Sequence, residues 1–503
     1  MLIFFIIHFK RITRKAMIGA MLSHGATDAG FPLILVFDKA VMMKNVSSAV
    51  AVSRNPATGE VFARYPFATI AEVDSALALT NGAFQYWRHS AMSDRVQLLR
   101  NVAGALRQQA RELAEMMTSE MGKPVDQGLA EVEKSARLCE WYAEQGPAFL
   151  QREPTLVEGN KAFVDYLPLG PVLSVMPWNF PVWQVLRGAV PILLAGNSYL
   201  LKPAPNVMGC ALLLQQILSR VGVPEGLFAV VNADNDGVAQ AINDRRIAAV
   251  TVTGSVRAGA AIAALSGAAI KKCVLELGGS DAFIVLADAD IDAAVKGAIA
   301  GRFMNNGQLC ISAKRIIVEA PVFDAFRDKF VSAVKEMKIG DPRESGTWIG
   351  PMARYDLRDE LDSQVQATLK EGATLLLGGH VLPGEGNYYA PTVLSDVKPG
   401  MTSFAQELFG PVASLIQADN AEHAVVMAND SEFGLGGSLW SRDLAVAQKL
   451  ASRIETGGVF INSPSFSDPR VPIGGVKKSG FGRELSHFGL REFTNTQTVW
   501  MEE

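Results

Sequence analysis

The stretch GPVLSVMPWNFP (residues 170–181) decides the fold class, because a short apolar strand runs directly into a proline-bounded turn. Further apolar segments of strand length follow, each separated from the next by enough chain to form a helix. These segments lie at residues 172–176, 198–202, 228–231 and 248–253. Strands that alternate with helices pack as a parallel, doubly wound sheet. The sequence therefore predicts an α/β protein.

A second strand–helix series begins near Cys273. It contains strand-type segments at residues 274–277 and 283–286, followed by a helical pattern over residues 293–305. We expect two α/β units that join near residues 270–276.

The segments around these units are of two kinds. An amphipathic helix is predicted to start at Ser93 or Asp94, either of which can cap it, and to end at Gly122. Two extended segments, residues 155–166 and 494–500, have no core of their own. We expect them to pair with another subunit.

Composition and charge exclude several classes of protein. The 503 residues fit about three structural units, and 49% hydrophobic with 19% charged residues is typical of a globular chain. A net charge of −4 provides no basic surface for nucleic acid. The longest uncharged stretch, residues 167–186, contains four prolines and so cannot form a continuous membrane-spanning helix.

The N-terminal segment differs from the rest of the chain. Its apolar start precedes its basic residues, which is the reverse of a secretory signal. We expect residues 1–44 to be an unstructured extension, with Met42 or Met43 as the natural start. Four cysteines are too few for a disulfide scaffold and favour a reducing compartment, hence a cytoplasmic protein.

The four cysteines have different surroundings. Cys139, Cys210 and Cys273 lie in apolar helical or strand segments and are expected to be core residues. Cys310 lies in NNGQLCIS (residues 305–312), a polar turn whose backbone amides can lower the pKa of a thiol. From the residues alone, a reactive and an inert Cys310 are equally consistent.

Two further residues are candidates for catalysis. Glu276 is a carboxylate within an apolar strand, where burial raises its pKa towards that of a general base. Asn179 lies between two prolines, and a rigid amide is suited to an oxyanion hole. A paired strand-end carboxylate and an ordinary asparagine turn remain the alternatives.

The chain also carries signals for phosphate binding. The stretch TVTGSVRAG (residues 251–259) predicts a strand, a turn of small residues and a helix N-terminus, which suits a phosphate. Lys202 ends a preceding strand, at the edge of a parallel sheet where ligands bind. The six histidines have no metal-ligand spacing, so no metal site is predicted.

Seven motifs in the chain together resemble the aldehyde dehydrogenase superfamily, in the family's order and from about residue 50 onward. They are MPWNFP (176–181), LKPA (201–204), TVTGS (251–255), LELGG (275–279), GQLC (307–310), ELFGPV (407–412) and GGVKKSGFGRE (474–484). The resemblance implies a Rossmann-like cofactor domain, a catalytic domain and a small β oligomerisation element. Residues 45–150 and 169–275 would form the NAD(P)-binding domain, 276–487 the catalytic domain, and 151–168 with 488–503 the oligomerisation element of a homodimer or homotetramer.

The resemblance also implies a role for each catalytic candidate. Cys310 would attack an aldehyde to give a thiohemiacetal, with Asn179 and the backbone N–H of Cys310 holding the oxyanion. Hydride would pass to the nicotinamide and leave a thioester, which water activated by Glu276 would hydrolyse. The residues implied to bind the cofactor are Pro177, Trp178, Lys202, Pro205, Thr253, Gly254, Ser255, Leu277, Gly278, Glu407 and Phe409.

Pro205 departs from the pattern of NAD-preferring relatives, which often carry a glutamate there to bind the ribose hydroxyls. The absence of that glutamate removes the repulsion between its carboxylate and the 2′-phosphate of NADP. We expect NAD to be the preferred cofactor and NADP a weaker substitute.

Arg187 bears on the substrate, because arginine at this position resembles the succinate-semialdehyde dehydrogenases, which use it to bind the distal carboxylate. Ser467 matches a serine of that subfamily's substrate loop. Met304 replaces a second family arginine, for which Arg470 or Arg302 would have to compensate. The alternative is that Arg187 forms a structural salt bridge.

Three other functions are weighed against this expectation. The same fold serves aldehyde dehydrogenases of broad specificity for uncharged aldehydes, and acylating relatives that pass the thioester to coenzyme A or phosphate. Glu276 favours water as the acceptor. A non-catalytic structural protein would have lost the nucleophile or the base, whereas Cys310, Glu276 and Asn179 are all present.

Overall fold

The computed structural model describes residues 50–502, and the predicted extension and start sites lie outside these residues. The first of its two larger sheets has six strands in the order β19-β9-β8-β5-β6-β7. All neighbours in it are parallel except the β19–β9 pair. Its strands are β5 (Val172–Met176), β6 (Tyr199–Pro203), β7 (Phe228–Val230), β8 (Ala249–Thr253), β9 (Lys272–Glu276) and β19 (Gly480–Phe481).

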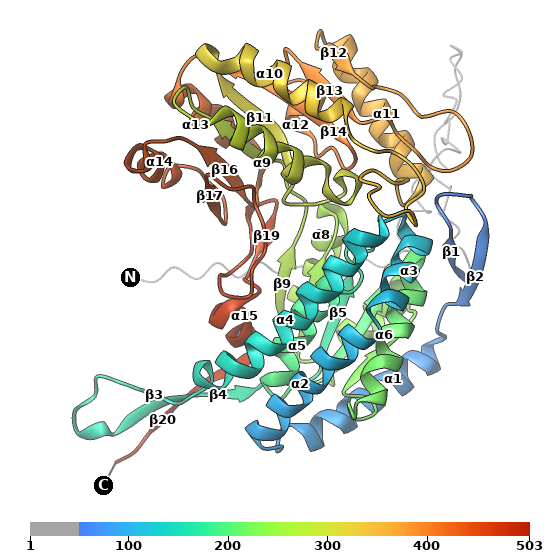
Figure 1. The fold of residues 1–503 in the computed structure, drawn as a ribbon. Coiled ribbons are helices and arrows are strands. Elements are labelled where there is room, and N and C mark those ends of the chain that lie inside the picture. Colours follow the sequence, from blue (N-terminus) through green and yellow to red (C-terminus); the bar gives the residue numbers. More distant parts are fainter. Residues whose placement is uncertain (1–49, 503) are drawn as a thin grey trace, which may run out of the picture. The chain divides into compact units, whose positions relative to one another are not determined.

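Helices cover both faces of this sheet (Figure 1). Along β5, Val172 and Met176 pack into one apolar core and Leu173 into another, as the two-residue period of a strand buried on both faces requires. The helices on the Leu173 side are α1 (Ile70–Trp87), α7 (Asn235–Asn243) and α8 (Val256–Ala268). Those on the Val172 side are α2 (Met92–Gln108), α3 (Ala110–Met121), α4 (Val125–Phe149), α5 (Trp183–Leu194), α6 (Met208–Arg220) and α15 (Ser486–Glu492).

The second sheet has seven strands in the order β12-β13-β14-β11-β10-β16-β17, parallel except for β12. Its strands are β10 (Asp281–Val285), β11 (Ala313–Glu319), β12 (Thr374–Leu377), β13 (Thr392–Ser395), β14 (Val412–Ala418), β16 (Gly437–Trp440) and β17 (Val459–Ile461). Its helices are α9 (Ile291–Phe303) and α10 (Ala320–Lys335) on one face, and α11 (Tyr355–Lys370), α12 (Thr402–Ala405), α13 (Ala421–Asn429) and α14 (Leu444–Ala451) on the other. The prediction of two doubly wound α/β arrangements is thereby confirmed.

Strand β19 crosses the predicted boundary between the two domains. It belongs to the segment 276–487 that was assigned to the catalytic domain, yet it pairs with β9 in the six-stranded sheet, with Gly480 opposite Glu276. This pairing brings the C-terminal tail motif alongside Glu276. The division of the chain into cofactor and catalytic domains otherwise stays a prediction.

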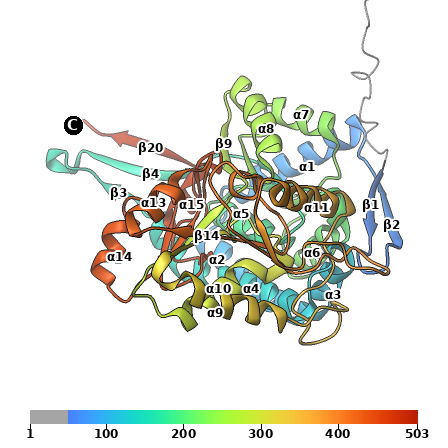
Figure 2. The same ribbon diagram turned by 90° about the horizontal axis from the view of Figure 1, so that it is seen from above.

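The remaining strands form small sheets. The predicted β segments pair with each other in a three-stranded sheet, β20-β4-β3, which extends away from the helices in both views (Figures 1 and 2). Its strands are β3 (Glu153–Pro154), β4 (Ala162–Pro168) and β20 (Thr494–Trp500). Two antiparallel two-stranded sheets complete the set, β1 (Val50–Arg54) with β2 (Val61–Pro66), and β15 (Phe433–Gly434) with β18 (Val476–Lys477).

The N-terminal helices correct one prediction. A single helix ending at Gly122 is wrong, because α2 stops at Gln108, the chain turns at Gln109, and α3 begins at Ala110. The apolar spacing continues across the break, since α3 buries Leu113 against α4 and α6, so periodicity gave no sign of it. The predicted caps are also wrong, because Ala91 is the N-cap and makes no side-chain bond. Gly122 does end the second helix, with a left-handed φ of 74°.

Within residues 50–502, no helix is both long and apolar enough to cross a membrane. The proline-rich stretch identified in the sequence instead forms the end of β4, then β5, a turn and the start of α5.

Candidate active site

The carboxyl ends of four neighbouring strands gather most of the predicted cofactor residues on one edge of the six-stranded sheet. Strands β9, β8, β5 and β6 are adjacent and parallel, so the residues at their ends meet at the same edge. The residues at these ends are Pro177 and Trp178 after β5, Lys202 and Pro205 at β6, Thr253, Gly254 and Ser255 at β8, and Leu277 and Gly278 after β9.

The turn after β8 is suited to an anionic group. Ser255 caps α8, its hydroxyl accepting a hydrogen bond from the backbone N–H of Ala258 at 3.3 Å. A side chain at Gly254 would meet open space, so a ligand can approach the backbone there. Burial lowers the pKa of Lys202, while the charge of Asp234 raises it. An open helix N-terminus near a lysine on the same edge fits the pyrophosphate of a dinucleotide.

Cys310 follows a turn in which three consecutive residues have left-handed backbone. The φ angles are 53° at Asn305, 58° at Asn306 and 72° at Gly307. Asparagine and glycine tolerate this region better than other residues. The side chain of Asn306 secures the turn by donating to the carbonyl oxygen of Pro351 at 2.9 Å and accepting from the N–H of Gly350 at 2.7 Å.

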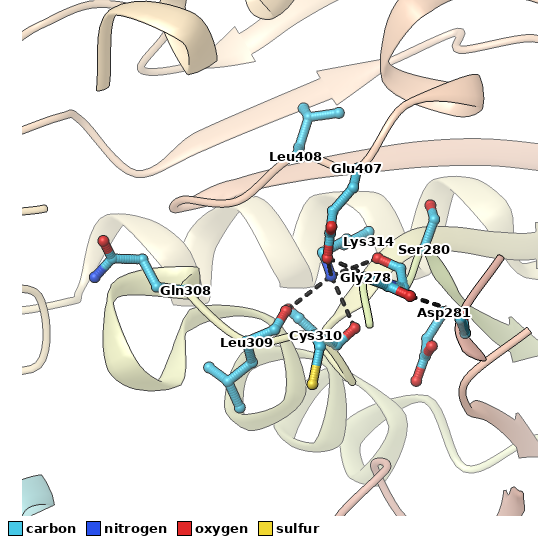
Figure 3. Close-up of polar contacts among 12 residues, drawn as sticks. Gly278, Ser280, Asp281, Gln308, Leu309, Cys310, Lys314, Glu407 and Leu408 are labelled. Atoms are coloured by element: carbon cyan, nitrogen blue, oxygen red, sulfur yellow. Dashed lines mark hydrogen bonds and ion pairs between the residues drawn. The ribbon is translucent and has the colours of Figure 1, made fainter. Parts of the chain in front are cut away.

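Lys314, at the start of β11, ties three of the sequence motifs together (Figure 3). Its ammonium donates to the carbonyl oxygens of Gly279 at 2.6 Å and Cys310 at 2.9 Å, and forms an ion pair with Glu407 at 2.9 Å. A further bond at 2.8 Å reaches the carbonyl oxygen of Leu309. Lys314 thereby fixes the backbone on both sides of the peptide that carries the thiol.

The double glycine of LELGG allows this close approach. The backbone N–H of Gly279 donates to Glu407 at 3.0 Å. A Cβ added at Gly278 would lie 2.3 Å from the Glu407 carboxylate, and one at Gly279 would lie 2.6 Å from the carbonyl oxygen of Cys310. Side chains at either position would therefore separate the two loops. Phe409, two residues after Glu407 in the ELFGPV motif, packs edge-to-face against Trp178 with ring centroids 5.7 Å apart.

Asn179 lies beside the cysteine turn and is buried. Its side-chain amide donates to the carbonyl oxygen of Gln308 at 2.9 Å, and Asn305 in turn donates to the carbonyl oxygen of Asn179 at 2.9 Å. An amide nitrogen carries two hydrogens, so this bond uses one of the two donors. The arrangement suits an amide that also stabilises an oxyanion.

Glu131 on α4 supports the turn that carries Asn179. Its carboxylate accepts from the backbone N–H groups of Val182 at 3.0 Å and Trp183 at 2.9 Å, at the N-terminus of α5. It also forms a buried ion pair with Lys123, whose ammonium lies 3.8 Å from the ring centroid of Phe180.

A cavity of about 330 Å³ opens beside Cys310. Its walls come from α4, the turn and helix that carry Asn179 and Arg187, the end of α9, the cysteine turn and the loop around Ser467. The lining residues are Lys123, Gln127, Ala130, Glu131, Lys134, Asn179, Phe180, Trp183, Gln184, Arg187, Ala300, Gly301, Met304, Leu309, Cys310, Ile311, Trp348, Pro464, Ser465, Phe466, Ser467 and Ile473.

Burial raises the pKa of both reacting groups. Burial raises the pKa of the Cys310 thiol to about 11, although the charges of Lys314 and Arg187 lower it. Burial also raises the pKa of Glu276 well above that of an ordinary carboxyl group, and Arg187 lowers it in part. The carboxylate of a group with a raised pKa is a stronger base than an ordinary carboxylate, so Glu276 suits a general base once it is deprotonated.

Both residues predicted to bind substrate, Arg187 and Ser467, lie in the wall of the cavity. Met304 lines it as well. Arg187 forms a buried ion pair with Glu484 of the tail motif, their side chains being 4% and 3% exposed. Burial alone lowers the pKa of Arg187, but Glu484 and Glu276 outweigh it and raise the pKa. The ion pair is what the structural alternative predicts, and substrate binding by Arg187 stays a prediction.

Neither proposed substitute for the missing second arginine faces this cavity. Arg302 is fully buried and donates to the carbonyl oxygens of Gly307 at 3.1 Å and Leu408 at 3.0 Å. It is therefore a structural residue, and the expectation that it compensates is wrong. Arg470 lies outside the cavity lining and pairs with Asp468 at 2.7 Å.

Sequence reasoning missed Lys134, Lys314 and Glu131. On α4, Glu131 and Ser135 fall on the same buried stripe as Val132 and Ala136. Polar residues on an apolar helix face were the available signal. Among residues 50–502, no group of three or more histidine, cysteine or acidic side chains is placed to hold a metal ion.

Comparisons with known proteins agree with this geometry. The succinate semialdehyde dehydrogenase [NAD(P)+] of Escherichia coli (strain K12) is 59% identical over 452 residues, which cover 90% of this chain and 98% of that protein. A probable succinate-semialdehyde dehydrogenase [NADP(+)] of Synechocystis is 46% identical over 447 residues, or 89% and 98% of the two chains. The crystal structure of the succinic semialdehyde dehydrogenase of Streptococcus pyogenes with NADP+ has a TM-score of 0.88 at 34% identity, and covers 90% of this chain and 100% of that one.

The model of the aldehyde dehydrogenase family matches residues 43–499, which is most of the chain and includes every motif discussed above. This protein therefore belongs to the aldehyde dehydrogenase family.

Proposed function

We propose that this protein oxidises succinate semialdehyde to succinate with NAD(P)+. The observation that carries the proposal is the cavity at Cys310, which combines a thiol and a rigid amide with the cationic side chains of Lys134 and Arg187. A small aldehyde that carries a carboxylate matches this combination of groups. The relatives named above are succinate-semialdehyde dehydrogenases, which supports the same substrate.

The chemistry begins at Cys310. Its sulfur forms a bond to the aldehyde carbon, while the thiol proton passes to a base and the carbonyl oxygen becomes an oxyanion. Asn179 and the backbone N–H of Cys310 stabilise that oxyanion. A bound nicotinamide dinucleotide supplies the acceptor for the hydride that leaves the thiohemiacetal carbon. Glu276 then takes a proton from water, which attacks the thioester and releases the acid and the thiol.

For the cofactor, the open helix N-terminus at Ser255 and the buried Lys202 would hold the pyrophosphate and ribose. Pro205 starts a short 3₁₀ turn, Pro205–Val207, and has no carboxylate to repel a 2′-phosphate. Use of both NAD+ and NADP+ follows. A preference for NAD+ stays a prediction, and the relatives, which are named for NAD(P)+ or NADP+, point more towards NADP+.

A substrate panel tests the proposed function. The initial rate of NAD(P)H formation would be measured with succinate semialdehyde, butanal, glutarate semialdehyde and benzaldehyde, each with NAD+ and with NADP+. We expect kcat/KM for succinate semialdehyde to lead by at least about tenfold, which is about 1.4 kcal/mol at the transition state. Equal values for butanal or benzaldehyde would instead indicate an aldehyde dehydrogenase of broad specificity, and stimulation by coenzyme A an acylating enzyme.

We also propose that the protein is a homodimer or homotetramer that works in the cytoplasm. Strand β20 forms one edge of the β20-β4-β3 sheet and exposes most of its side chains, so it offers a free edge for a second copy. All four cysteines are free thiols, which suits a reducing compartment. The molar mass from light scattering tests the assembly.

A further inference from the structure

We propose that Lys134 is the specificity-determining residue of the cavity and that, together with Ser467, it binds the distal carboxylate of the substrate. The inference rests on the proposed function and names the group that selects the semialdehyde. Lys134 lies on α4 and was not among the residues that the sequence predicted to bind substrate.

Charge balance separates Lys134 from the other cations of the cavity. Among the described lining residues, Lys123, Lys134 and Arg187 carry positive charge. Lys123 is ion-paired with Glu131, and Arg187 is ion-paired with Glu484. Lys134 has no carboxylate within ion-pair distance in the described part of the chain. Lys134 is partly buried, and because a charge withdrawn from water is costly without an opposite charge, it is suited to an anionic ligand.

Two contacts hold the ammonium of Lys134 beside Ser467 in the wall of the cavity. Its Nζ donates to the hydroxyl of Ser467 at 2.7 Å and lies 4.1 Å from the ring centroid of Trp183. The Ser467 hydroxyl can itself donate, so a carboxylate there would accept one hydrogen bond from each residue. The cation–π contact with Trp183 keeps the flexible lysine in position.

The position of Lys134 also fits the far end of a short substrate. Lys134 and Ser467 line the cavity at Cys310 and, in addition, an outer cavity of about 490 Å³ that Cys310 does not line. The pair therefore lies where the two cavities adjoin, and only the first of the two is lined by Cys310. Arg187, in contrast, lowers the pKa of Cys310 and of Glu276, and so acts on the reacting groups themselves.

Deprotonation of Lys134 should make the binding of a carboxylate substrate depend on pH. Burial lowers the pKa of Lys134 to about 8, as do Arg187 and Lys123, while Glu131 and Asp468 raise it. The lysine is charged below this pH and neutral above it. Binding of a carboxylate should therefore weaken as the pH rises through about 8, whereas binding of an uncharged aldehyde has no such dependence.

The test compares kcat/KM for succinate semialdehyde with that for butanal, between pH 6.5 and 9.5. For Lys134→Met we expect the ratio of the two values to fall by about 100-fold. Lys134→Arg keeps the charge and should restore a large part of the ratio. Arg137→Met, one turn further on α4, is the matched control: Arg137 lines the outer cavity but not the cavity at Cys310, and it is already paired with Glu133, so this variant should keep the wild-type ratio.

The outcomes separate the two proposals. A wild-type ratio near one overturns the proposed substrate and the role of Lys134 with it. A high wild-type ratio that survives in Lys134→Met, or that does not change through pH 8, overturns the role of Lys134 alone. If Lys134→Met does not fold, Ser467→Ala and the pH dependence of the wild-type ratio provide the same test.

Discussion

Arg187 on α5 and Glu484 in the C-terminal tail motif form an ion pair that is almost completely buried. Removing one partner of a buried pair leaves an uncompensated charge, whereas removing both does not. We expect Arg187→Met to lower the free energy of unfolding by about 3–5 kcal/mol, and the double variant Arg187→Met/Glu484→Gln to recover most of that loss. Denaturant unfolding of the two variants checks this. Equal losses in the single and double variants would show that the pair is not coupled.

The same double variant separates structure from specificity. If it folds and keeps the preference for succinate semialdehyde over butanal, Arg187 is a structural residue. If the preference is lost while Lys134→Met keeps it, Arg187 binds the carboxylate, as the family resemblance implies. The comparison needs no variant that carries an unpaired buried charge.

Cys310→Ala should abolish turnover, because Cys310 is the only thiol among the described residues that line the cavity. The change removes one sulfur atom from a partly exposed position, so cofactor binding should persist. Cys273→Ala, at another partly exposed cysteine, is the matched control and should keep full activity. Residual activity of Cys310→Ala would show that a different residue is the nucleophile.

Alkylation gives a second readout for Cys310. Its pKa of about 11 means that the thiolate is a minor species at pH 7 in the protein without ligands. The rate of reaction with iodoacetamide should therefore rise about tenfold per pH unit up to that pKa, because the thiolate is the reacting form. A rate that is already maximal at pH 7 would contradict the raised pKa.

Glu276→Gln should slow thioester hydrolysis by about 10²–10⁴-fold, the usual contribution of a general base. The raised pKa of Glu276 fixes the sign of the pH dependence. Hydrolysis needs the carboxylate, so the rate should increase with pH through a pKa well above the ordinary value. The glutamine variant should lose this rising limb. Rapid-mixing measurements that separate the first turnover from the steady state would detect it, and an unchanged steady-state rate would point to another base or another limiting step.

Features that depend on residues close together in the sequence were predicted, whereas features that depend on residues far apart in the sequence were not. Strand β20 was predicted with its observed bounds, because strand composition is a local property. The break at Gln109 was missed, since the apolar period runs through it and packing against α4 and α6 sets the turn. Lys134 was missed because its position depends on Ser467, which lies 333 residues away in the sequence.

Asn179 illustrates the same limit within the active site. The sequence predicted a rigid amide between two prolines, but not its bond to Gln308 or the support from Asn305. Asn305 also donates to the carbonyl oxygen of Gln308, at 3.2 Å, so the cysteine turn keeps one of its two amide contacts when Asn179 is truncated. Asn179→Ala should therefore lower kcat by about 10²–10³-fold with the fold retained, as loss of one oxyanion donor does. A rise in KM with kcat unchanged would instead indicate that Asn179 contributes to substrate binding.

Lys314 should be more important for the integrity of the site than for the reaction itself. Its ammonium is buried and satisfies the carbonyl oxygens of Gly279, Leu309 and Cys310 together with Glu407. Methionine has a similar volume but no donor, so Lys314→Met would leave all four acceptors without this partner, at about 1–3 kcal/mol for each acceptor that stays buried. We expect a large drop in the melting temperature and a loss of activity in the fraction that folds. Glu407→Gln is the control, because it removes the ion pair but leaves the three carbonyl bonds, and it should lower stability far less. Equal losses in the two variants would mean that the ion pair, and not the backbone contacts, holds the cysteine turn in place.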